Sequence, residues 1–179
     1  TFLRACAQVR RVLPRAQFSV IGPPADPSYA ARCHALAHHL DLSDALTFVE
    51  DARQMRPWYE RLDVVTLTSR SEAAPLVLLE AMAHARPVVA TDVGDCQRLV
   101  HGPDDAYGPA GILCPPGAPT AVAQSLLALS TSARLRRQYG WDGRQRVASS
   151  YHRPQMIDAY RQVYTALVSS PHPAPRAHV

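Results

Sequence analysis

Residues 63–91 read DVVTLTSRSEAAPLVLLEAMAHARPVVAT, and the fold class can be predicted from this segment. Its first seven residues, 63–69, are rich in apolar and β-branched side chains, which predicts a central parallel strand covered on both faces. Residues 76–83 are predicted to form a helix, and the apolar residues 87–91 a second strand. A strand, a helix and a strand in this order indicate a parallel βαβ unit.

The same alternation continues on both sides of this segment. Further helices are predicted at 2–13, 29–40, 53–61 and 95–100, further strands at 16–21, 46–49 and 111–114, and two or three closing helices up to about Ser169. This order predicts an α/β fold with a Rossmann-like, doubly wound parallel sheet and helices on both of its faces. In such sheets ligands bind beyond the carboxyl ends of the strands.

The predicted elements divide the chain into three parts. Residues 1–150 form the Rossmann-like domain, 151–169 a C-terminal helix, and 170–179 a Pro-rich, disordered tail. Because a Rossmann-like unit begins with a strand and the first predicted element is a helix, we expect its first strand to lie upstream of Thr1. The last helix has one apolar face, which either crosses to another domain or packs on its own domain: Met156, Tyr160, Val163, Tyr164 and Leu167.

The composition of the chain excludes several classes of protein. With 47% hydrophobic and 19% charged residues among 179, the chain is globular rather than disordered. No apolar run approaches the roughly 20 residues that a membrane span needs. The four cysteines are scattered without a CxxC pair, which indicates reduced thiols and a cytoplasmic location: Cys6, Cys33, Cys96 and Cys114.

The basic net charge of +4 does not indicate a nucleic-acid partner. All 19 basic residues are arginines, and they are dispersed along the chain without the interleaved aromatic residues of a base-stacking surface. His34 and His38 stand at helical i, i+4 spacing with no carboxylate in register, so a surface helix is favoured over a metal site.

Two glutamates, Glu72 and Glu80, flank the start of the predicted helix with seven residues between them. Pro75 suits the first turn, where no amide proton is needed. The amides of Leu76 and Val77 lack intrahelical partners and lie at the positive end of the helix dipole, which favours a phosphate. Ionised carboxylates accept hydrogen bonds from hydroxyls. A ligand with phosphates between two polyols, such as a nucleotide sugar, fits this pattern.

A second interpretation is that Glu72 only caps the helix and Glu80 lies on the surface, and the spacing alone favours it. The wider sequence favours the first interpretation. Residues 69–83 are similar to the Glu-x7-Glu motif of the family 4 retaining glycosyltransferases of the GT-B fold, and RPVVATDVG (86–94) looks like the strand and turn that follow it. The resemblance extends from Thr1 to about Ser169. Four segments resemble the Pel-polysaccharide glycosyltransferase subgroup: TFLRACA (1–7), SEAAPLV (71–77), VGDC (93–96) and GPAGI (108–112).

This resemblance implies roles for particular residues. Glu72 would be the catalytic residue that holds hydroxyls of the donor sugar, and Glu80 would hold the ribose hydroxyls. The turn of Ala74, Pro75, Leu76 and Val77 would hold the diphosphate through its backbone amides. Gly22 and the loop at Val49 and Glu50 would flank the base. The donor is expected to be a UDP-sugar, glucose or a related hexose, with no metal and no other cofactor.

The same resemblance implies an enzyme that transfers the hexose to a growing polysaccharide, an exopolysaccharide such as Pel. Its acceptor would bind an N-terminal domain upstream of this chain, and its partners would include a membrane synthase complex. The arginine and lysine that stabilise the leaving group in the family also lie upstream, so residues 1–179 alone are expected to bind nucleotide weakly and not to turn over. Two alternatives stay open: half of a UDP-sugar epimerase, and a non-catalytic nucleotide-binding or scaffold module.

Overall fold

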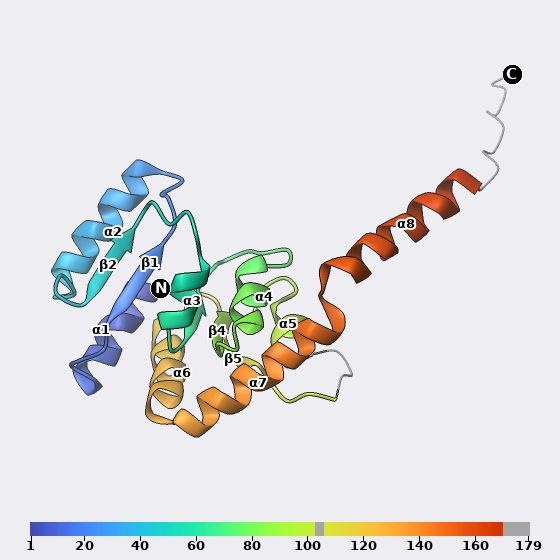
Figure 1. Cartoon of the computed structure of the whole chain (residues 1–179). Helices are drawn as coiled ribbons and strands as arrows, with labels where there is room; N and C mark the ends of the chain where they lie inside the picture. The colour runs from blue at the N-terminus through green and yellow to red at the C-terminus, as the bar shows by residue number, and fades with distance from the viewer. Residues whose placement is uncertain (103–105, 170–179) are drawn as a thin grey trace, which may run out of the picture.

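The computed structural model describes residues 1–102 and 106–169 (Figure 1). The predicted tail at 170–179 lies outside the described residues. The helices are α1 Phe2–Val12, α2 Pro27–His39, α3 Arg56–Arg61, α4 Leu76–Ala83, α5 Cys96–His101, α6 Pro119–Thr131, α7 Ala133–Ser150 and α8 Arg153–Ser169. The strands are β1 Phe18–Ile21, β2 Leu46–Val49, β3 Val65–Leu67, β4 Val88–Thr91 and β5 Gly111–Cys114. The predicted alternation of helices and strands is confirmed.

The strands form two parallel sheets. β1 pairs with β2, and β4 lies between β3 and β5 in the second sheet. The prediction that residues 63–69 form a central strand is therefore wrong for the residues that the structure describes, because β3 pairs only with β4. β4 is buried along its whole length, whereas Thr66 and Leu67 of β3 are half-buried. An apolar, β-branched run indicates burial, and it does not by itself give a strand its position in the sheet.

Helices cover both faces of β4. Val88 and Ala90 pack in a cluster with residues of α4 and α5, and this cluster also contains Tyr59 of α3. Val89, which points to the opposite face, packs with α6 and with Ala5 and Val9 of α1. The fold is therefore doubly wound, as predicted. A third cluster joins α1 and α2 to the β1–β2 sheet through Leu3, Cys6, Ala37, Leu42 and Leu46.

α7 passes close to the end of α4 at Gly140 and Gly143, and it carries a buried arginine. A Cβ atom on Gly140 would collide with the carbonyl of Ala85, so only glycine allows this close approach. The Arg146 side chain is fully buried. Its guanidinium donates hydrogen bonds to the carbonyl oxygens of Val100 at 2.9 Å and Gly108 at 2.8 Å. Arg146 thereby ties the last turn of α5, where the Val100 carbonyl also accepts from the Ala110 amide, to the segment before β5.

α8 extends away from the rest of the molecule (Figure 1). No residue of α8 is buried, so the alternative in which this helix packs on its own domain does not hold. No helix among residues 1–102 and 106–169 is both long enough and apolar enough to span a bilayer.

Candidate functional site

The loop between β3 and α4, which carries Glu72, is held in place by the turn that follows β4. The Thr91 hydroxyl donates a hydrogen bond to the carbonyl of Ser69 at 2.7 Å, and the Asp95 amide donates to the carbonyl of Ala73 at 2.8 Å. Gly94 has φ +55°, and a Cβ atom there would collide with the carbonyl of Glu72. The two loops therefore fit together only with glycine at this position.

Replacement of Gly94 by alanine is expected to displace the Glu72 loop. The substitution forces a side chain into a left-handed conformation and against a backbone carbonyl, so we expect the free energy of unfolding to fall by about 2 kcal/mol. Urea denaturation measures this change. The matched control is Gly117→Ala: Gly117 also has a positive φ, of +76°, but the Cβ atom would meet no neighbour. If both variants lost equal stability, the close fit between the loops would be refuted.

The first turn of α4 is open. Pro75 is the N-cap residue with ψ 111°, so it stands one position before the helix rather than inside the first turn as predicted. The Leu78 amide donates to the carbonyl of Pro75 at 3.1 Å, whereas the amides of Leu76 and Val77 have no acceptor among the residues that the structure describes. Ala74 is exposed, and the Leu76 side chain is 67% exposed. The two free amides can therefore receive an anion from solvent.

Glu80 lies one turn into α4, and its carboxylate is held by a neighbouring helix. The hydroxyl of Tyr59, on α3, donates a hydrogen bond to Oε2 of Glu80 at 2.8 Å. Burial raises the pKa of Tyr59, and the bond to Glu80 raises it further, so the phenol keeps its proton. Glu80 is exposed, as the second interpretation expects of a surface residue, but its carboxylate is bonded to Tyr59 as well as open to solvent.

Glu72 is half-buried near the start of α5. The pKa of the Cys96 thiol is raised first by burial and then by the negative charges of Glu72, Asp92 and Asp95. Among the residues that the structure describes, Glu72 makes no capping hydrogen bond to α4, whose N-cap residue is Pro75, so the interpretation of Glu72 as a helix cap is wrong. Within the described part of the chain neither Glu72 nor Glu80 forms an ion pair, which leaves both carboxylates able to accept hydrogen bonds from a ligand.

The residues predicted to flank a base lie at the carboxyl ends of β1 and β2. The Gly22 amide donates to the carbonyl of Val49 at 2.9 Å, and Glu50, the next residue, is exposed. The structure thus brings Gly22, Val49 and Glu50 together. Among the described residues, no hydrogen bond or ion pair joins them to Glu72 or Glu80. In Figure 1 the loops after β1 and β2 and the loop before α4 lie on the same upper side of the molecule.

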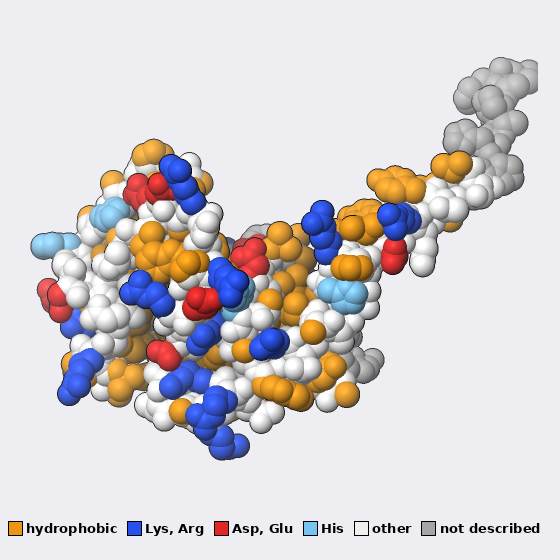
Figure 2. All heavy atoms as spheres, viewed as in Figure 1, with side chains coloured by type: hydrophobic (Ala, Val, Ile, Leu, Met, Phe, Trp, Pro, Cys, Tyr) orange, Lys and Arg blue, Asp and Glu red, His pale blue; other side chains and the backbone are white. Residues whose placement is uncertain are grey.

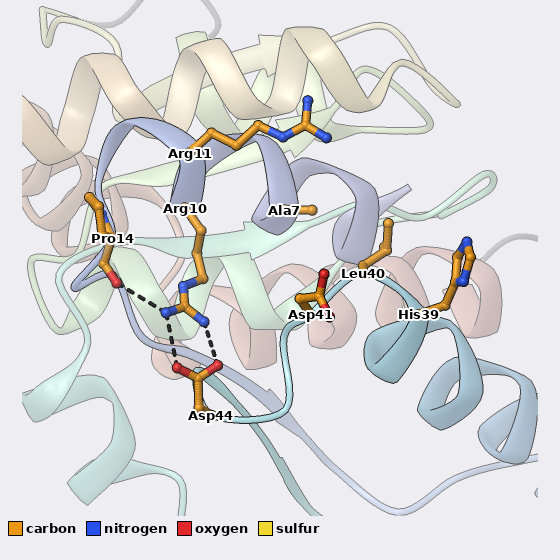
Figure 3. A pocket seen from close by; sticks show the side chains of 8 residues that line it. All are labelled: Ala7, Arg10, Arg11, Pro14, His39, Leu40, Asp41 and Asp44. Carbon is orange, nitrogen blue, oxygen red and sulfur yellow. Dashed lines mark hydrogen bonds and ion pairs between the residues drawn. The ribbon is translucent and has the colours of Figure 1, made fainter.

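A cavity of about 500 Å³ lies at the opposite ends of β1 and β2, between α1 and the segment that joins α2 to β2 (Figure 3). Inside it the guanidinium of Arg10 donates to both oxygens of Asp44, at 2.6 and 3.0 Å, and to the carbonyl of Pro14 at 3.2 Å. Because Arg10 and Asp44 are paired with each other across it, this cavity has the character of a structural contact rather than of the predicted site. Nearby on α2, the His34 ring packs against Phe48 with 4.0 Å between ring centroids, which fits a surface helix rather than a metal site.

Sequence reasoning missed Tyr59 as a residue of the site. Residues 53–61 were predicted as a polar helix, yet Tyr59 is only 2% exposed and contacts a residue 21 positions away. The burial of Tyr59 could have been predicted from its place among charged residues, because a large aromatic side chain on a polar helix usually lies on the face that packs inward.

Comparison with known proteins agrees with this geometry. A family model described as Glycosyl transferases group 1 matches residues 1–132. The D-inositol 3-phosphate glycosyltransferase of Streptomyces bingchenggensis is 32% identical over 134 residues, which cover 73% of this chain but 28% of that protein. The chain thus spans less than a third of the length of this relative.

Solved structures with the same fold are GT-B glycosyltransferases. The C-terminal domain of the group 1 glycosyl transferase LpcC from Francisella tularensis is 26% identical with a TM-score of 0.71, and the match covers 83% of this chain and 76% of that one. HepE from Anabaena, solved in complex with UDP, is 20% identical with a TM-score of 0.79, and the match covers 94% of this chain and 44% of HepE. These matches agree with the predicted fold class.

Proposed function

The chain belongs to the group 1 glycosyl transferase family, and we propose that it forms the donor-binding half of a family 4 retaining glycosyltransferase. The observation that carries this proposal is the open first turn of α4. Two unpaired backbone amides lie there, with the Glu72 loop immediately before them and the oriented carboxylate of Glu80 one turn later. This arrangement supplies donors for a diphosphate and acceptors for the hydroxyl groups of two sugars.

In the proposed complex the amides of Leu76 and Val77 bind the diphosphate of a UDP-sugar. Glu80 accepts hydrogen bonds from the ribose hydroxyls, and Glu72 accepts them from hydroxyls of the hexose. Gly22, Val49 and Glu50 border the base. UDP is the proposed nucleotide because HepE, which has the same fold, was solved with it. The donor is proposed to be UDP-glucose or a close relative, and the reaction is proposed to need no metal.

The acceptor is proposed to bind a further domain of the same protein, since the chain spans less than a third of its curated relative. The exposed face of α8 supports this proposal: Met156, Tyr160, Val163, Tyr164 and Leu167 are each more than half exposed. Figure 2 shows apolar side chains gathered along this projecting helix. We propose that α8 crosses to the acceptor domain. A structure of the full-length protein with this face in solvent would refute the crossing.

The proposed acceptor is a growing exopolysaccharide such as Pel. This assignment depends on the likeness to the Pel subgroup at 1–7, 71–77, 93–96 and 108–112, and a membrane synthase complex is the corresponding partner. All four cysteines are free, which suits a cytoplasmic site of reaction.

Calorimetry with UDP and UDP-glucose on the full-length gene product tests the proposal. Replacement of Glu80 by alanine is expected to lower the affinity for UDP about 10- to 30-fold, because hydrogen bonds between the ribose hydroxyls and a charged carboxylate are lost. The matched control is Glu60→Ala, since Glu60 is also exposed but is paired with Arg56 on α3.

The same titrations separate the alternatives. A non-catalytic scaffold would show no nucleotide binding by the wild type. An epimerase would bind the donor and convert its sugar without transfer to an acceptor. If Glu80→Ala bound UDP as tightly as the wild type, the assignment of Glu80 to the ribose would be wrong.

A further inference from the structure

Tyr59 is set in the core so that only its hydroxyl reaches the proposed site. The residue is 2% exposed, and its ring belongs to the buried cluster that also contains Leu78 and Met82 of α4. Its hydroxyl donates to Oε2 of Glu80 at 2.8 Å. The helix that carries Glu80 and the ring that orients its carboxylate are therefore parts of one packed unit.

His84 fixes the other face of the Tyr59 ring. The two rings stack with 5.0 Å between centroids and 23° between planes. Nδ1 of His84 lies 2.8 Å from the backbone carbonyl of Glu80. A carbonyl oxygen only accepts, so Nδ1 carries the proton of this hydrogen bond, and the imidazole is anchored to α4. The phenol is thus held between the core and a ring that cannot turn freely.

This contact changes what Glu80 can do. A glutamate on an exposed helix position samples several rotamers. The entropy lost when a ligand fixes one of them reduces the binding affinity. With Oε2 bound to Tyr59, the carboxylate has one preferred orientation before any ligand arrives. Its second oxygen, Oε1, has no donor among the residues that the structure describes, so it can accept from hydroxyl groups on neighbouring carbons.

We propose that Tyr59 is a positioning residue that holds Glu80 for the ribose hydroxyls and so sets the preference for a ribonucleotide over a 2′-deoxyribonucleotide. The inference rests on the proposed donor-binding function. It adds that the ribose preference depends on a side chain that reaches the proposed site only through Glu80. A site arranged to accept hydrogen bonds from a hydroxyl discriminates against an analogue that lacks it.

The test is calorimetry of the full-length protein with UDP and with 2′-deoxy-UDP. Tyr59→Phe removes one oxygen atom and keeps the buried ring. We expect it to weaken the binding of UDP about 3- to 10-fold, and to weaken the binding of 2′-deoxy-UDP by less, because that nucleotide keeps only the 3′-hydroxyl for Glu80. In the Glu80→Ala background, Tyr59→Phe is expected to have no further effect. The matched control is Tyr139→Phe, a half-buried tyrosine of α7 in a different cluster.

The outcomes distinguish this inference from the proposed function. An equal loss for both nucleotides, a loss that persists in the Glu80→Ala background, or no loss at all would overturn the positioning role. If Glu80→Ala lowers the affinity for UDP and Tyr59→Phe does not, only the positioning role of Tyr59 is refuted. If Glu80→Ala itself leaves the affinity for UDP unchanged, the assignment of Glu80 to the ribose is refuted, and the proposed function with it. Should Tyr59→Phe not fold, His84→Ala carries the test with an expected ribose-dependent loss of about 2- to 4-fold.

Discussion

Replacement of Glu72 by glutamine is expected to lower the rate of hexose transfer by the full-length protein about 100-fold. Glutamine has nearly the same shape, but it lacks the negative charge and one of the two acceptor oxygens that would hold the donor sugar. Loss of a contact that orients the reacting group typically costs this much even when the nucleotide stays bound. The measurement is the initial rate of UDP release from UDP-glucose in the presence of the acceptor.

The affinity for UDP separates a lost sugar contact from a collapsed site. We expect Glu72→Gln to bind UDP within about 2-fold of the wild type, because the diphosphate is assigned to backbone amides and the ribose to Glu80. Asp63→Asn is the matched control, since Asp63 is an exposed carboxylate at the amino end of β3. A Glu72→Gln variant that kept the full transfer rate would remove Glu72 from the catalytic site.

Replacement of Arg146 by methionine is expected to lower the free energy of unfolding by about 3 to 5 kcal/mol. Methionine fills much of the same space but donates no hydrogen bonds. The carbonyl of Gly108 would then lose the guanidinium donor, and that of Val100 would keep only the Ala110 amide, and each lost bond to the charged guanidinium costs about 1–3 kcal/mol. The expected total is a large part of the stability of an ordinary domain.

Urea denaturation measures this effect, and a neighbouring arginine supplies the control. Arg144 lies on the same helix but is exposed, so Arg144→Met is expected to change stability by less than about 0.5 kcal/mol. A loss below about 1 kcal/mol for Arg146→Met would mean that other donors or water replace the guanidinium.

Much of the fold follows from local sequence patterns. The bounds of β2, α4 and β5 agree with the predicted ranges 46–49, 76–83 and 111–114, since each of these segments is a compact apolar run with polar residues, glycine or proline beside it. The position of a strand in its sheet depends on contacts far along the chain, so β3 was wrongly expected at the centre. The burial of Arg146 was equally hidden, because α7 is a polar helix whose arginines look alike in sequence.

Only those parts of the candidate site that are close together in sequence could be predicted. Glu72 and Glu80 are close in sequence and border one helix, so their spacing was visible. Tyr59 reaches Glu80 from another helix, and Gly94 meets the Glu72 loop only after β4 pairs with β3. Such contacts depend on the packed fold, and neither composition nor periodicity reports them.

A crystal structure of the full-length protein with UDP-glucose would show whether the first turn of α4 binds the diphosphate. We expect diphosphate oxygens about 3 Å from the amide nitrogens of Leu76 and Val77, with the ribose hydroxyls at a similar distance from the Glu80 carboxylate and the hexose against Glu72. A diphosphate bound away from the first turn of α4, or a Glu80 carboxylate that points away from the ribose, would contradict this expectation.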